Sequence, residues 1–451
     1  MNIKHYSIKY IILNKKKLIN KNILIKGWVK FFRNNLFLEI NDGSTIKNIQ
    51  IILNKKFKKK IKKINIGIPL KVLGKLILLK DNKIEIIPFY IKIYGKIDKN
   101  FFNNSILQNK FHNLFKLRKQ KYLRFRTKIF SSIMRIRHNL SIKIHNFFNK
   151  KNFFYVHTPI ITNNDTEGIG NLFNVTILKN CKSKNYKNDF FGCKTNLTVS
   201  GQLEAESAML GLKKVYTFGP VFRAENSNTN KHLSEFWMVE PEIMFYNLNK
   251  LINLSIKLIK YLIKSILNKC IEELNFLQNY NNNNLIKKLK NIYKKKFIKI
   301  SYNNIIKLLN KNNYNINWGD DISSNYENFL FKNIFKKNIP IIIYNFPKKI
   351  KPFYMKVNKD NLTTKSIDIL FPNIGEIIGG SEREYSYKKL LIRLKEMNIK
   401  KNKINWYLNL RKLGTIYHSG FGLGFDRFVQ FITGMKNIRD VIPFPRCPGM
   451  I

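Results

Sequence analysis

The stretch Tyr216-Thr-Phe-Gly-Pro-Val-Phe-Arg-Ala-Glu225 places an arginine and a glutamate at the end of a predicted strand, 218–225. After a short polar loop, the chain resumes as a second apolar run, Phe236-Trp-Met-Val-Glu240. Two strands joined by a loop rich in Asn and Ser can hold a charged ligand between fixed side chains. These segments therefore predict a strand–loop–strand element that binds a charged group.

A second arginine follows much later in the chain, in Gly420-Phe-Gly-Leu-Gly-Phe-Asp-Arg427. The small residues of this segment let the backbone approach a ligand closely. Arginines from two distant segments, together with nearby carboxylates, are what a nucleoside triphosphate and its metal ion require. The two segments together indicate a triphosphate site.

The charges of the chain are numerous and unevenly distributed. Its 451 residues include 83 Lys and Arg against 27 Asp and Glu, a net charge of +56, which favours polyanionic partners such as RNA or DNA. The alternative is that the charge reflects a general enrichment of Lys, Asn and Ile throughout the chain. We therefore use the charge only as an indication of the kind of partner. Six acids lie between residues 201 and 242: Glu204, Glu206, Glu225, Glu235, Glu240 and Glu242. Carboxylates clustered beside the two-strand element indicate substrate or metal contacts.

Other features disfavour several classes of protein. The four cysteines form no CxxC pair and have no His at zinc-ligand spacing, which disfavours a structural metal site and a disulfide framework. Lys or Asn interrupts every apolar run before it reaches the roughly 18 residues of a membrane span. The N-terminus has no secretory apolar core; it is basic and poor in acids, as organellar targeting peptides are, but so is the whole chain. We therefore expect a cytoplasmic protein without a membrane segment.

Residues 1–100 form a β-rich segment. Five short strands are predicted, with a turn at Asp42-Gly43, and they suit a small barrel of the OB type. The strands are expected at 23–29, 36–40, 49–53, 70–73 and 83–87. Any other small all-β domain is the alternative. Basic residues interleaved with aromatic ones favour single-stranded nucleic acid as the ligand, at Trp28, Phe31, Phe32, Arg33 and Phe37.

The rest of the chain alternates helices with short strands. Residues 101–126 are basic, show no helix or strand pattern, and are interpreted as a linker. Apolar residues recur at helical spacing over 127–148, and a strand over 153–156, with Pro159 at its edge, follows. Residues 247–274 predict a second amphipathic helix, and the low-complexity tract 279–284 predicts an exposed loop.

Six longer strings occur in an order that resembles class II aminoacyl-tRNA synthetases, and specifically the asparaginyl-tRNA synthetases. They are Asp165-Thr-Glu-Gly168, Thr198-Val-Ser-Gly-Gln-Leu203, Phe222-Arg-Ala-Glu-Asn-Ser-Asn228, Gly375-Glu-Ile-Ile-Gly-Gly-Ser381, His418-Ser-Gly-Phe-Gly-Leu-Gly424 and Arg439-Asp-Val-Ile-Pro-Phe-Pro-Arg446. The resemblance covers nearly the whole chain, from Gly27 to Arg446. It implies an α+β protein with an N-terminal OB-fold and a class II catalytic domain, an antiparallel sheet flanked by helices.

The resemblance also implies an ATP site. Arg223 matches the family arginine that binds the α-phosphate and the substrate carboxylate, and Arg427 matches the one on the γ-phosphate, so both are the expected catalytic residues. Asp368 and Glu376 match the acidic pair that holds Mg²⁺. The full ATP-binding set implied is Arg223, Glu225, His232, Phe236, Glu376, Gly424 and Arg427, where Phe236 would stack on adenine, Glu225 would contact its amino edge and His232 would reach the terminal phosphates. For His232 the alternative is a surface-loop histidine.

For the amino-acid pocket, the implied set is Glu167, Ser200, Gln202, Ala205, Glu206 and Arg383. Glu167 and Gln202 would hold the α-ammonium and orient the substrate, and Arg383 would bind its side-chain oxygen. Aspartyl enzymes carry a lysine where this chain has Ala205, which is followed by Glu206. A carboxylate accepts an N–H from a side-chain amide but repels an aspartate carboxylate, so asparagine is the favoured substrate.

Two departures from the family pattern stand out. Asp426 precedes the motif arginine, where asparaginyl enzymes usually have Glu and aspartyl enzymes usually have Asp; its carboxylate is expected to support the arginine. The loop from Arg33 to Phe37 is also shorter than the family norm. Even so, Arg33, Phe37 and Gln50 match the anticodon readers, with Phe37 stacking on a base and Gln50 reading the central uridine. The alternative for Phe37 is barrel core.

The combined expectation is a homodimeric, cytoplasmic asparagine–tRNA ligase that uses ATP, Mg²⁺, L-asparagine and tRNA(Asn). Its OB-fold would occupy 1–100, its linker 101–126, and its catalytic domain 127–451, with a helical insertion at about 247–335. Helix 127–148 and the Pro159 strand would form the dimer interface. Two rivals remain open: an aspartyl-tRNA synthetase, including one that does not discriminate between tRNAs, and a noncatalytic tRNA-binding paralogue.

Overall fold

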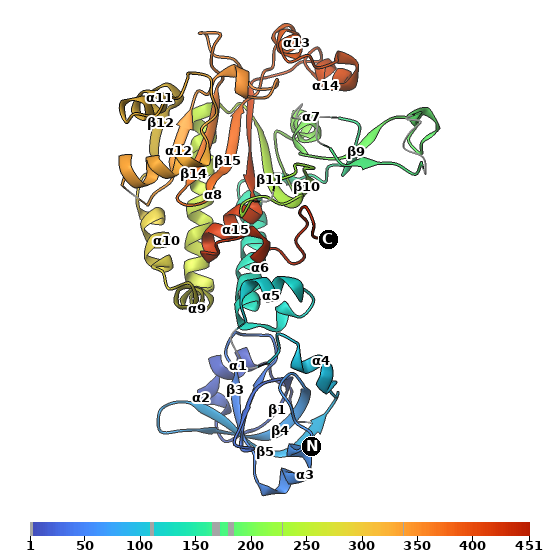
Figure 1. Cartoon of the computed structure of the whole chain (residues 1–451), viewed down its shortest axis with the longest axis vertical. Coiled ribbons are helices and arrows are strands. Elements are labelled where there is room, and N and C mark those ends of the chain that lie inside the picture. Colours follow the sequence, from blue (N-terminus) through green and yellow to red (C-terminus); the bar gives the residue numbers. More distant parts are fainter. Residues whose placement is uncertain (1–2, 109–111, 165–171, 179–184, 228, 337) are drawn as a thin grey trace. The chain divides into compact units, whose positions relative to one another are not determined.

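The computed structural model describes residues 3–108, 112–164, 172–178, 185–227, 229–336 and 338–451. The chain forms two compact units, Met1–Arg135 and Ile136–Ile451. The first unit contains a small β-barrel, and the second contains a large mostly antiparallel sheet with helices (Figure 1). The α+β class predicted from the sequence is confirmed.

Five strands close the barrel in the order β1-β2-β3-β5-β4. Their bounds are β1 Asn22–Arg33, β2 Phe37–Asn41, β3 Ile49–Ile52, β4 Pro69–Leu78 and β5 Ile84–Ile93. Alternate residues such as Ile23, Ile25 and Val72 are completely buried, because successive side chains in a strand point to opposite faces. Short helical segments accompany the barrel: α1 Ile8–Leu13, α2 Lys15–Leu18, η1 Lys55–Phe57 and α3 Lys58–Ile61. The predicted five-stranded barrel is confirmed.

The expectation of no helix over 101–126 is wrong. This segment contains most of α4 Lys99–Asn103, all of α5 Leu114–Lys119 and the 3₁₀ turn η2 Arg124–Arg126. The helices start at side-chain caps: Asp98 accepts from the backbone N–H groups of Asn100 and Phe101, and Asn113 accepts from that of Lys116. Helices this short show too few turns for hydrophobic periodicity, so the capping residues are their only clear signal.

The second unit is built on an eight-stranded sheet in the order β12-β13-β14-β15-β16-β11-β10-β6. Its strands are β6 Phe154–Tyr155, β10 Lys214–Phe222, β11 Glu235–Met244, β12 Ile298–Ser301, β13 Ile341–Tyr344, β14 Ser366–Phe371, β15 Gly375–Glu382 and β16 His418–Gly424. All neighbours pair antiparallel except β12 with β13 and β6 with β10. The predicted strand–loop–strand element is the β10–β11 hairpin, and Arg223 and Glu225 lie just past the end of β10.

The strand expected over 153–156 is shorter than predicted, and Pro159 lies outside it. Only β6 pairs with β10, over two residues, before the chain turns away. It then enters a separate three-stranded sheet, β7 Ile161–Thr162, β9 Thr195–Leu197 and β8 Asn174–Val175 in spatial order. The turn η3 Tyr186–Asn188 precedes β9, and the helix α7 Gln202–Leu212 follows it.

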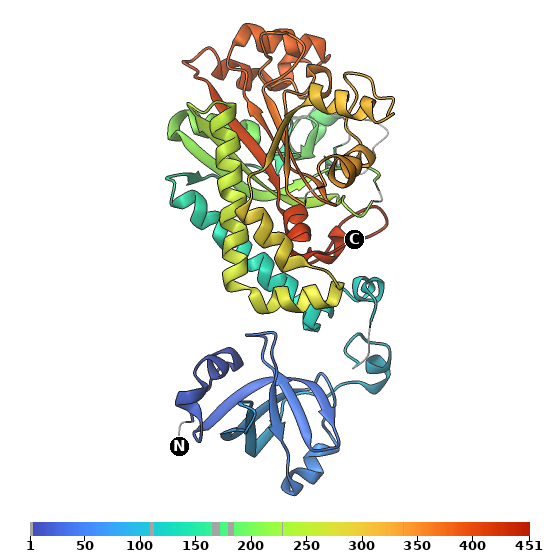
Figure 2. The same cartoon turned by 90° about the vertical axis from the view of Figure 1, so that its left-hand side faces the viewer.

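Two long helices cover one face of the large sheet (Figure 2). The helix α6 Lys128–Asn149 fits the prediction over 127–148 and packs on β10, where Phe148 stacks on Tyr216 with 4.5 Å between ring centroids. The helix α8 Leu248–Lys269 packs against β14, β15 and β16. The single helix expected over 247–274 is in fact two, because the chain breaks at Cys270 before α9 Ile271–Asn281.

The tract 279–284 is a loop only in part. Helix α9 continues to Asn281, and Asn282 then adopts a left-handed conformation with φ of 47° before α10 Leu285–Lys294. Asparagine tolerates that conformation and so ends the helix. The other helical segments are α11 Tyr302–Lys311, α12 Ser324–Phe329, the π-helical turn η4 Leu330–Ile334, η5 Lys348–Ile350, α13 Tyr387–Glu396, η6 Lys401–Ile404, α14 Asn405–Leu410, α15 Phe425–Thr433 and η7 Ile438–Asp440. In the described ranges, no helix is long and apolar enough to cross a membrane.

Candidate functional site

A cavity of about 250 Å³ opens beside the β10–β11 hairpin. The hairpin loop, β11, β15 and the junction of β16 with α15 contribute its lining. All seven residues predicted to bind ATP line it: Arg223, Glu225, His232, Phe236, Glu376, Gly424 and Arg427. Segments more than 200 residues apart in the sequence therefore converge on one site, as the motifs require.

Arg223 and Phe236 face each other across the hairpin. The backbone N–H of Arg223 donates to the carbonyl of Ser234 at 2.9 Å, which fixes the position where β10 ends. The guanidinium carbon of Arg223 lies 5.5 Å from the ring centroid of Phe236. A cation at this distance from a ring is attracted to its face, so the ring also helps to orient the guanidinium.

His232 is half-buried and lines the cavity. Its Nδ1 lies 2.6 Å from the hydroxyl of Thr229 and 3.0 Å from that of Ser227. Burial and the nearby positive charge of Arg427 lower the pKa of His232 below its ordinary value. The imidazole is therefore neutral at pH 7, and its position in the cavity disfavours an isolated surface-loop histidine.

Arg427 lies in the first turn of α15 and is held by backbone carbonyls. It donates to the carbonyl of Glu376 at 3.0 Å and to that of Lys231 at 3.3 Å. The neighbouring Asp426 bonds to Arg137 of α6 and accepts the backbone N–H of Trp237 at 2.8 Å. The Asp426 carboxylate thus ties α15 to α6 and β11, which makes its identity a poor guide to the amino-acid substrate.

The two acids predicted to bind metal lie on adjacent strands. Asp368 of β14 pairs with Gly379 of β15 in the strand register. A Cβ atom added to Gly379 would lie 2.6 Å from Glu376 Oε1 and 3.6 Å from Asp368 Oδ1, so both carboxylates converge on the space that this glycine leaves open. Lys351 Nζ donates to both oxygens of Asp368, at 2.6 and 2.9 Å. Burial raises the pKa of Asp368 to about 7, against the opposing effect of Lys351.

Glu206, a residue of α7, is at the centre of a buried cluster of polar side chains. One carboxylate oxygen accepts from Arg411 at 2.6 Å, from the hydroxyl of Tyr407 at 2.8 Å and from the His418 ring at 3.0 Å. Burial opposes ionisation, but Arg411, His418 and Arg383 prevail and lower the pKa of Glu206 below its ordinary value. Glu206 is therefore an ionised carboxylate in the interior.

Arg383 forms the other half of this cluster, which we call the buried charge cluster: Glu206, Glu242, Arg383, Tyr407, Arg411 and His418. The Arg383 guanidinium donates to the two oxygens of Glu242 at 2.5 and 3.2 Å and to the hydroxyl of Ser381 at 2.9 Å. It also lies 3.9 Å from Glu206. Burial raises the pKa of Glu242 to about 7, and Arg383 opposes this shift. Gly420 of β16 makes room for Glu242, because a Cβ there would lie 1.9 Å from the carboxylate.

The remaining predicted amino-acid residues lie around the start of α7. The Gln202 side-chain amide donates to the second oxygen of Glu206 at 3.0 Å, and Ala205 is completely buried. The Ser200 hydroxyl bonds to Glu240, which also accepts the backbone N–H of Gly201 at 3.0 Å. Glu167 lies outside the described residues. The structure thus brings Gln202, Glu206 and Arg383 together, whereas Ala205 packs in an apolar cluster with Met209 and Val215 and the Ser200 hydroxyl bonds to Glu240.

Sequence reasoning missed four members of the buried charge cluster. His418 and Glu242 belonged to segments already singled out, one in a glycine-rich motif and one in the acid-rich region, so a signal for them existed. Tyr407 and Arg411 had no such signal. They bond to Glu206 across more than 200 residues of sequence, and no local pattern reports contacts of that range.

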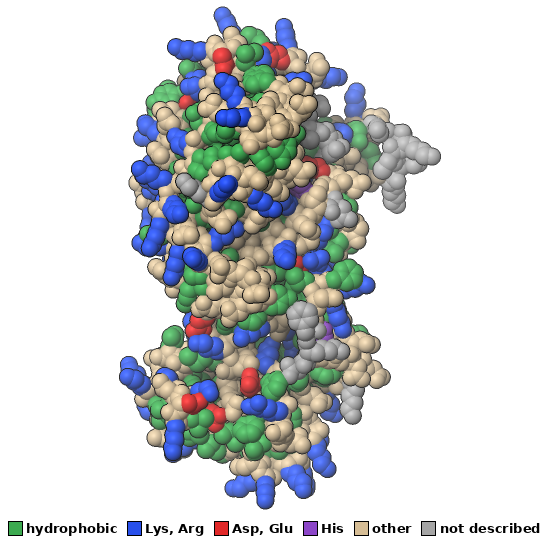
Figure 3. Space-filling view, turned by 60° about the vertical axis from the view of Figure 1, so that its left-hand side comes forward, with side chains coloured by type: hydrophobic (Ala, Val, Ile, Leu, Met, Phe, Trp, Pro, Cys, Tyr) green, Lys and Arg blue, Asp and Glu red, His purple; other side chains and the backbone are tan. Residues whose placement is uncertain are grey.

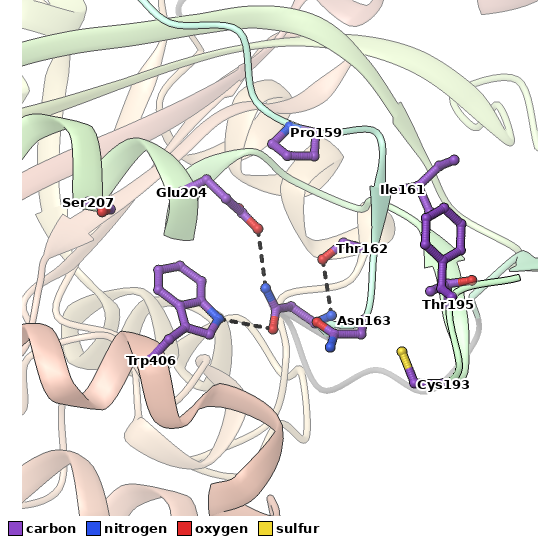
Figure 4. A pocket seen from close by; sticks show the side chains of 11 residues that line it. Pro159, Ile161, Thr162, Asn163, Cys193, Thr195, Glu204, Ser207 and Trp406 are labelled. Atoms are coloured by element: carbon purple, nitrogen blue, oxygen red, sulfur yellow. Dashed lines mark hydrogen bonds between the residues drawn. The ribbon is translucent and has the colours of Figure 1, made fainter. Parts of the chain in front are cut away.

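A larger cavity of about 550 Å³ lies between β7, β9, α7 and α14. Glu204 of α7 and Trp406 of α14 point into it from opposite sides (Figure 4). Both bond to Asn164, which donates to Glu204 at 3.2 Å and accepts from the Trp406 indole at 3.4 Å. Burial raises the pKa of Glu204. Of the predicted site residues that the structure describes, none lines this second cavity.

The predicted anticodon readers occupy one side of the barrel. The guanidinium carbon of Arg33 lies 5.4 Å from the Phe37 ring centroid, and Gln50 donates to Glu85 at 2.6 Å. Phe37 is half-buried and is not part of the barrel's buried core. The three side chains thus lie on β1, β2 and β3, which are consecutive around the barrel.

Comparison with known proteins agrees with this arrangement. A family model described as tRNA synthetases class II (D, K and N) matches residues 115–448. The chain is 48% identical over 447 residues to the asparagine–tRNA ligase of Azobacteroides pseudotrichonymphae, covering 95% of both chains. It is 47% identical over 461 residues to that of Borrelia garinii subsp. bavariensis, covering 98% of both.

Among solved structures, asparaginyl-tRNA synthetase from Pyrococcus horikoshii complexed with asparaginyl-adenylate is similar over the full length. The TM-score is 0.88 at 28% sequence identity, covering 100% of this chain and 99% of that chain. The similarity includes both the barrel and the large sheet.

Proposed function

The chain belongs to the class II tRNA synthetases of the D, K and N group, and we propose that it is an asparagine–tRNA ligase. It activates L-asparagine with ATP to asparaginyl-adenylate and transfers the asparagine to the 3′ end of tRNA(Asn). The observation that carries the site assignment is the placement of seven predicted ATP residues around one cavity, in the same unit as the buried charge cluster.

The activation step transfers an adenylyl group. The asparagine carboxylate attacks the α-phosphorus of ATP, a P–O bond forms, and the bond to the pyrophosphate oxygen breaks. Negative charge accumulates on the oxygens of the α-phosphate and on the leaving group, so fixed cations lower the barrier. We assign the α-phosphate and the substrate carboxylate to Arg223, and the γ-phosphate to Arg427. A planar guanidinium suits both tasks, because it donates two parallel hydrogen bonds to phosphate oxygens.

The adenine and terminal-phosphate contacts belong to the same cavity. We assign adenine stacking to Phe236, its amino edge to Glu225, the closest backbone approach to Gly424, and contacts with the terminal phosphates to the neutral imidazole of His232. Because Arg223 lies against the ring of Phe236, one hairpin orients both the base and the α-phosphate.

Asp368 and Glu376 would hold Mg²⁺. Their carboxylates converge on the open space at Gly379, and Mg²⁺ commonly binds one or two carboxylates and completes its shell with phosphate oxygens and water. Bound there, the ion would neutralise phosphate charge. In the described residues no cluster of three or more His, Cys, Asp or Glu side chains forms a metal site, which fits an ion that binds together with the nucleotide.

The buried charge cluster selects a neutral substrate side chain. Its carboxylates are already paired within the protein, Glu206 with Arg411 and Glu242 with Arg383, so the cluster offers no unpaired cation for a second carboxylate. An asparagine amide can accept from Arg383 and donate to Glu206 without adding charge. An aspartate carboxylate would add an unbalanced negative charge to a desolvated site, which strongly disfavours it. Ser200, Gln202 and Glu167 are assigned to the substrate backbone.

ATP–pyrophosphate exchange, run separately with asparagine and aspartate, tests this function. We expect exchange with asparagine and little with aspartate. Exchange driven only by aspartate would identify an aspartyl enzyme, and comparable exchange with both would identify a nondiscriminating one. Absence of exchange with intact tRNA binding would identify a noncatalytic paralogue.

We further propose the domain roles. Residues 1–100 bind the anticodon through Arg33, Phe37 and Gln50, residues 101–126 link the domains, and 127–451 carry catalysis, with a helical insertion at about 247–335. Anticodon recognition is tested by aminoacylation of tRNA(Asn) transcripts with a substituted central uridine. A Gln50→Ala variant should lose the distinction between substituted and native transcripts while keeping its ATP–pyrophosphate exchange.

A homodimer is proposed through α6 and the segment that contains β6 and Pro159. The two residues of β6, Phe154 and Tyr155, are 54% and 51% exposed, which is unusual for a strand beside a buried sheet. Light scattering after size exclusion should give twice the mass of the 53.6 kDa chain. A monomer at micromolar concentration would contradict the interface. We place the protein in the cytoplasm, with an organelle as the alternative that fractionation would reveal.

A further inference from the structure

Three lysines line up across three neighbouring strands on the outer face of the barrel. Lys26 of β1 pairs directly with Lys71 of β4, and Lys71 pairs directly with Lys92 of β5. The preceding register row, Ile25, Val72 and Ile91, is completely buried. Because successive side chains alternate between faces, the lysine row points outward.

Apolar and aromatic side chains flank the lysine row on both sides. One flanking row is Leu24, Leu73 and Tyr90, and the other is Trp28 and Pro69, continued by Tyr94, whose N–H donates to Pro69. Trp28, Tyr90 and Tyr94 are 43%, 42% and 51% exposed. We call these nine residues the striped face. It contains three lysines, three exposed aromatic rings and no acid.

The nearest segment, α3, adds a further lysine to the striped face. Lys60 donates to the backbone carbonyl of Ile91 at 2.6 Å, and its ammonium lies 5.3 Å from the ring centroid of Tyr90. Lys92 in turn lies 5.6 Å from the ring centroid of Tyr94. Lysine side chains and aromatic rings on the striped face therefore contact each other, and their rows also alternate in the strand register.

The excess of lysine in the chain does not by itself identify a binding surface. Lys and Arg side chains are scattered over the visible face of the molecule, with Asp and Glu side chains in a few places among them (Figure 3). The register of the striped face is more specific, because like charges directly opposite each other on neighbouring strands destabilise a sheet. A bound anion would relieve the repulsion within a row of three such charges.

The surface assigned to the anticodon differs in charge. There, Gln50 is bonded to Glu85 and pairs in register with Glu39, so two carboxylates lie among the predicted readers. Carboxylates suit base edges and repel phosphates. The striped face has the opposite chemistry, cations for phosphates and rings for bases, which is the combination found in proteins that bind single-stranded nucleic acid.

We propose that the striped face binds a single-stranded segment of the tRNA, with phosphates on Lys26, Lys71 and Lys92 and unpaired bases stacked on Trp28, Tyr90 or Tyr94. This inference rests on the proposed function and adds a second RNA surface to the barrel. RNA is favoured over an acidic protein because an acidic segment would match the lysines but would not stack on the three exposed rings.

The test is a triple variant, K26Q/K71Q/K92Q, in the full-length protein. Its matched control is K16Q/K17Q/K21Q, which removes the same charge from exposed lysines of the same unit outside the striped face. Binding of tRNA(Asn) is measured by filter retention between about 50 and 300 mM salt. We expect at least a tenfold loss of affinity at low salt for the striped-face variant, with a salt slope smaller by about two to three, since each lost phosphate contact lowers the slope by about 0.7–0.9.

Two further readouts separate a lost contact from a misfolded barrel. Relief of like-charge repulsion should raise the melting temperature of the striped-face variant at low salt, and the rise should shrink at high salt. Stacking on Trp28 should quench its fluorescence when an unstructured oligouridylate is added, and a Trp28→Phe variant identifies that signal. A polyglutamate of matched charge should bind more weakly than the oligouridylate and should not change the emission.

The proposal is overturned if the two triple variants lose equal affinity, because the effect would then be that of net charge alone. It is also overturned if the striped-face variant binds tRNA normally, or if polyglutamate binds as tightly as the oligouridylate. These outcomes are independent of the proposed function, which fails only if the unmodified protein shows no asparagine-dependent ATP–pyrophosphate exchange.

Discussion

The two halves of the proposed catalytic site handle charge in opposite ways. In the buried charge cluster, Glu206 and Glu242 already pair with Arg411 and Arg383. In the cavity assigned to ATP, the Arg427 guanidinium donates to neutral backbone carbonyls. The neighbouring carboxylate, Asp426, is paired with Arg137 of α6. One half is neutralised by the protein itself, whereas the other keeps cations positioned for an anion that arrives with the substrate.

This difference explains how one site accepts a highly charged ligand and a neutral side chain together. Neutralising the interior makes an added charge costly, so the amino-acid half discriminates by charge. Holding Arg427 by backbone carbonyls fixes the direction of its guanidinium without pairing it to a carboxylate, so the half assigned to ATP retains its attraction for phosphate. The predictions that follow test each half of this contrast.

The largest effect is expected from Arg223→Ala. Removing the guanidinium assigned to the α-phosphate should lower ATP–pyrophosphate exchange on the order of 1,000-fold, because its contact is strongest in the transition state. Binding of tRNA, measured by filter retention, should be unchanged. Arg223→Lys keeps the charge without the planar fork and should recover only a small part of the activity. Exchange at the normal rate in the alanine variant would show that the ATP half does not depend on this arginine.

Glu206→Gln should destabilise the buried charge cluster. It leaves Arg411 and Arg383 short of a carboxylate in the interior, and breaking a buried pair in this way costs about 3–5 kcal/mol. We expect thermal unfolding of the catalytic unit at a clearly lower temperature by calorimetry. The control is Glu204→Gln on the same helix, whose carboxylate has a pKa raised by burial and should lose little or nothing. Equal destabilisation by the two variants would contradict a special role for Glu206.

Glu242→Gln should change the selectivity of the site more than its stability. The substitution releases Arg383 from a carboxylate, so that an aspartate side chain could replace it as the ion-pair partner. We expect the ratio of kcat/KM for aspartate over asparagine to rise by about 10- to 100-fold in the exchange assay, or roughly 1.4–2.7 kcal/mol. Glu240→Gln, on the same strand and bonded to Ser200, is the matched control and should leave the ratio unchanged.

The smallest effect concerns Lys288, a half-buried cation that lies away from both halves of the proposed site. Its ammonium lies 4.8 Å from the Phe431 ring centroid, and burial lowers its pKa from 10.5 to about 8. Between pH 8 and 10.5 the unfolded chain binds the proton more strongly, so the unfolding free energy rises with pH over that window and the burial cost is full below pH 8.

Lys288→Met should therefore stabilise the protein by about 1–2 kcal/mol at pH 7, and this gain should disappear as the pH approaches 10.5. Denaturant melts of both proteins at pH 7, 9 and 10.5 measure it. A gain that is independent of pH would show that packing, and not the charge, accounts for the difference.

The sequence was most informative where chemistry and local pattern coincide. The β10–β11 hairpin was predicted because two apolar runs flank a short polar loop, with Arg223 expected at the end of the first run, and the barrel was predicted from five short β-rich segments. The convergence of seven ATP residues followed from family motifs, since no local pattern places Arg427 beside the hairpin. Their individual roles remain predictions.

The sequence was least informative for long-range electrostatic partners and for short helices. Arg411 and Tyr407 look like ordinary helix residues until the fold brings them to Glu206. Helix α5 was missed because six residues make less than two turns, too few to show a period, although its cap Asn113 was visible. The break at Cys270 was missed because the apolar pattern continues through it.

The proposed selectivity of the site should be sensitive to a substitution at Gly420. Its missing side chain is the volume that the Glu242 carboxylate occupies, so a single added methyl group would collide with that carboxylate at 1.9 Å. The displaced acid would leave Arg383 without its partner, even though no residue that touches the substrate had changed. Under the proposed assignment of Arg383 and Glu242, the choice between an amide and an acid as substrate would depend partly on one glycine codon, at which a single-base change adds the methyl group.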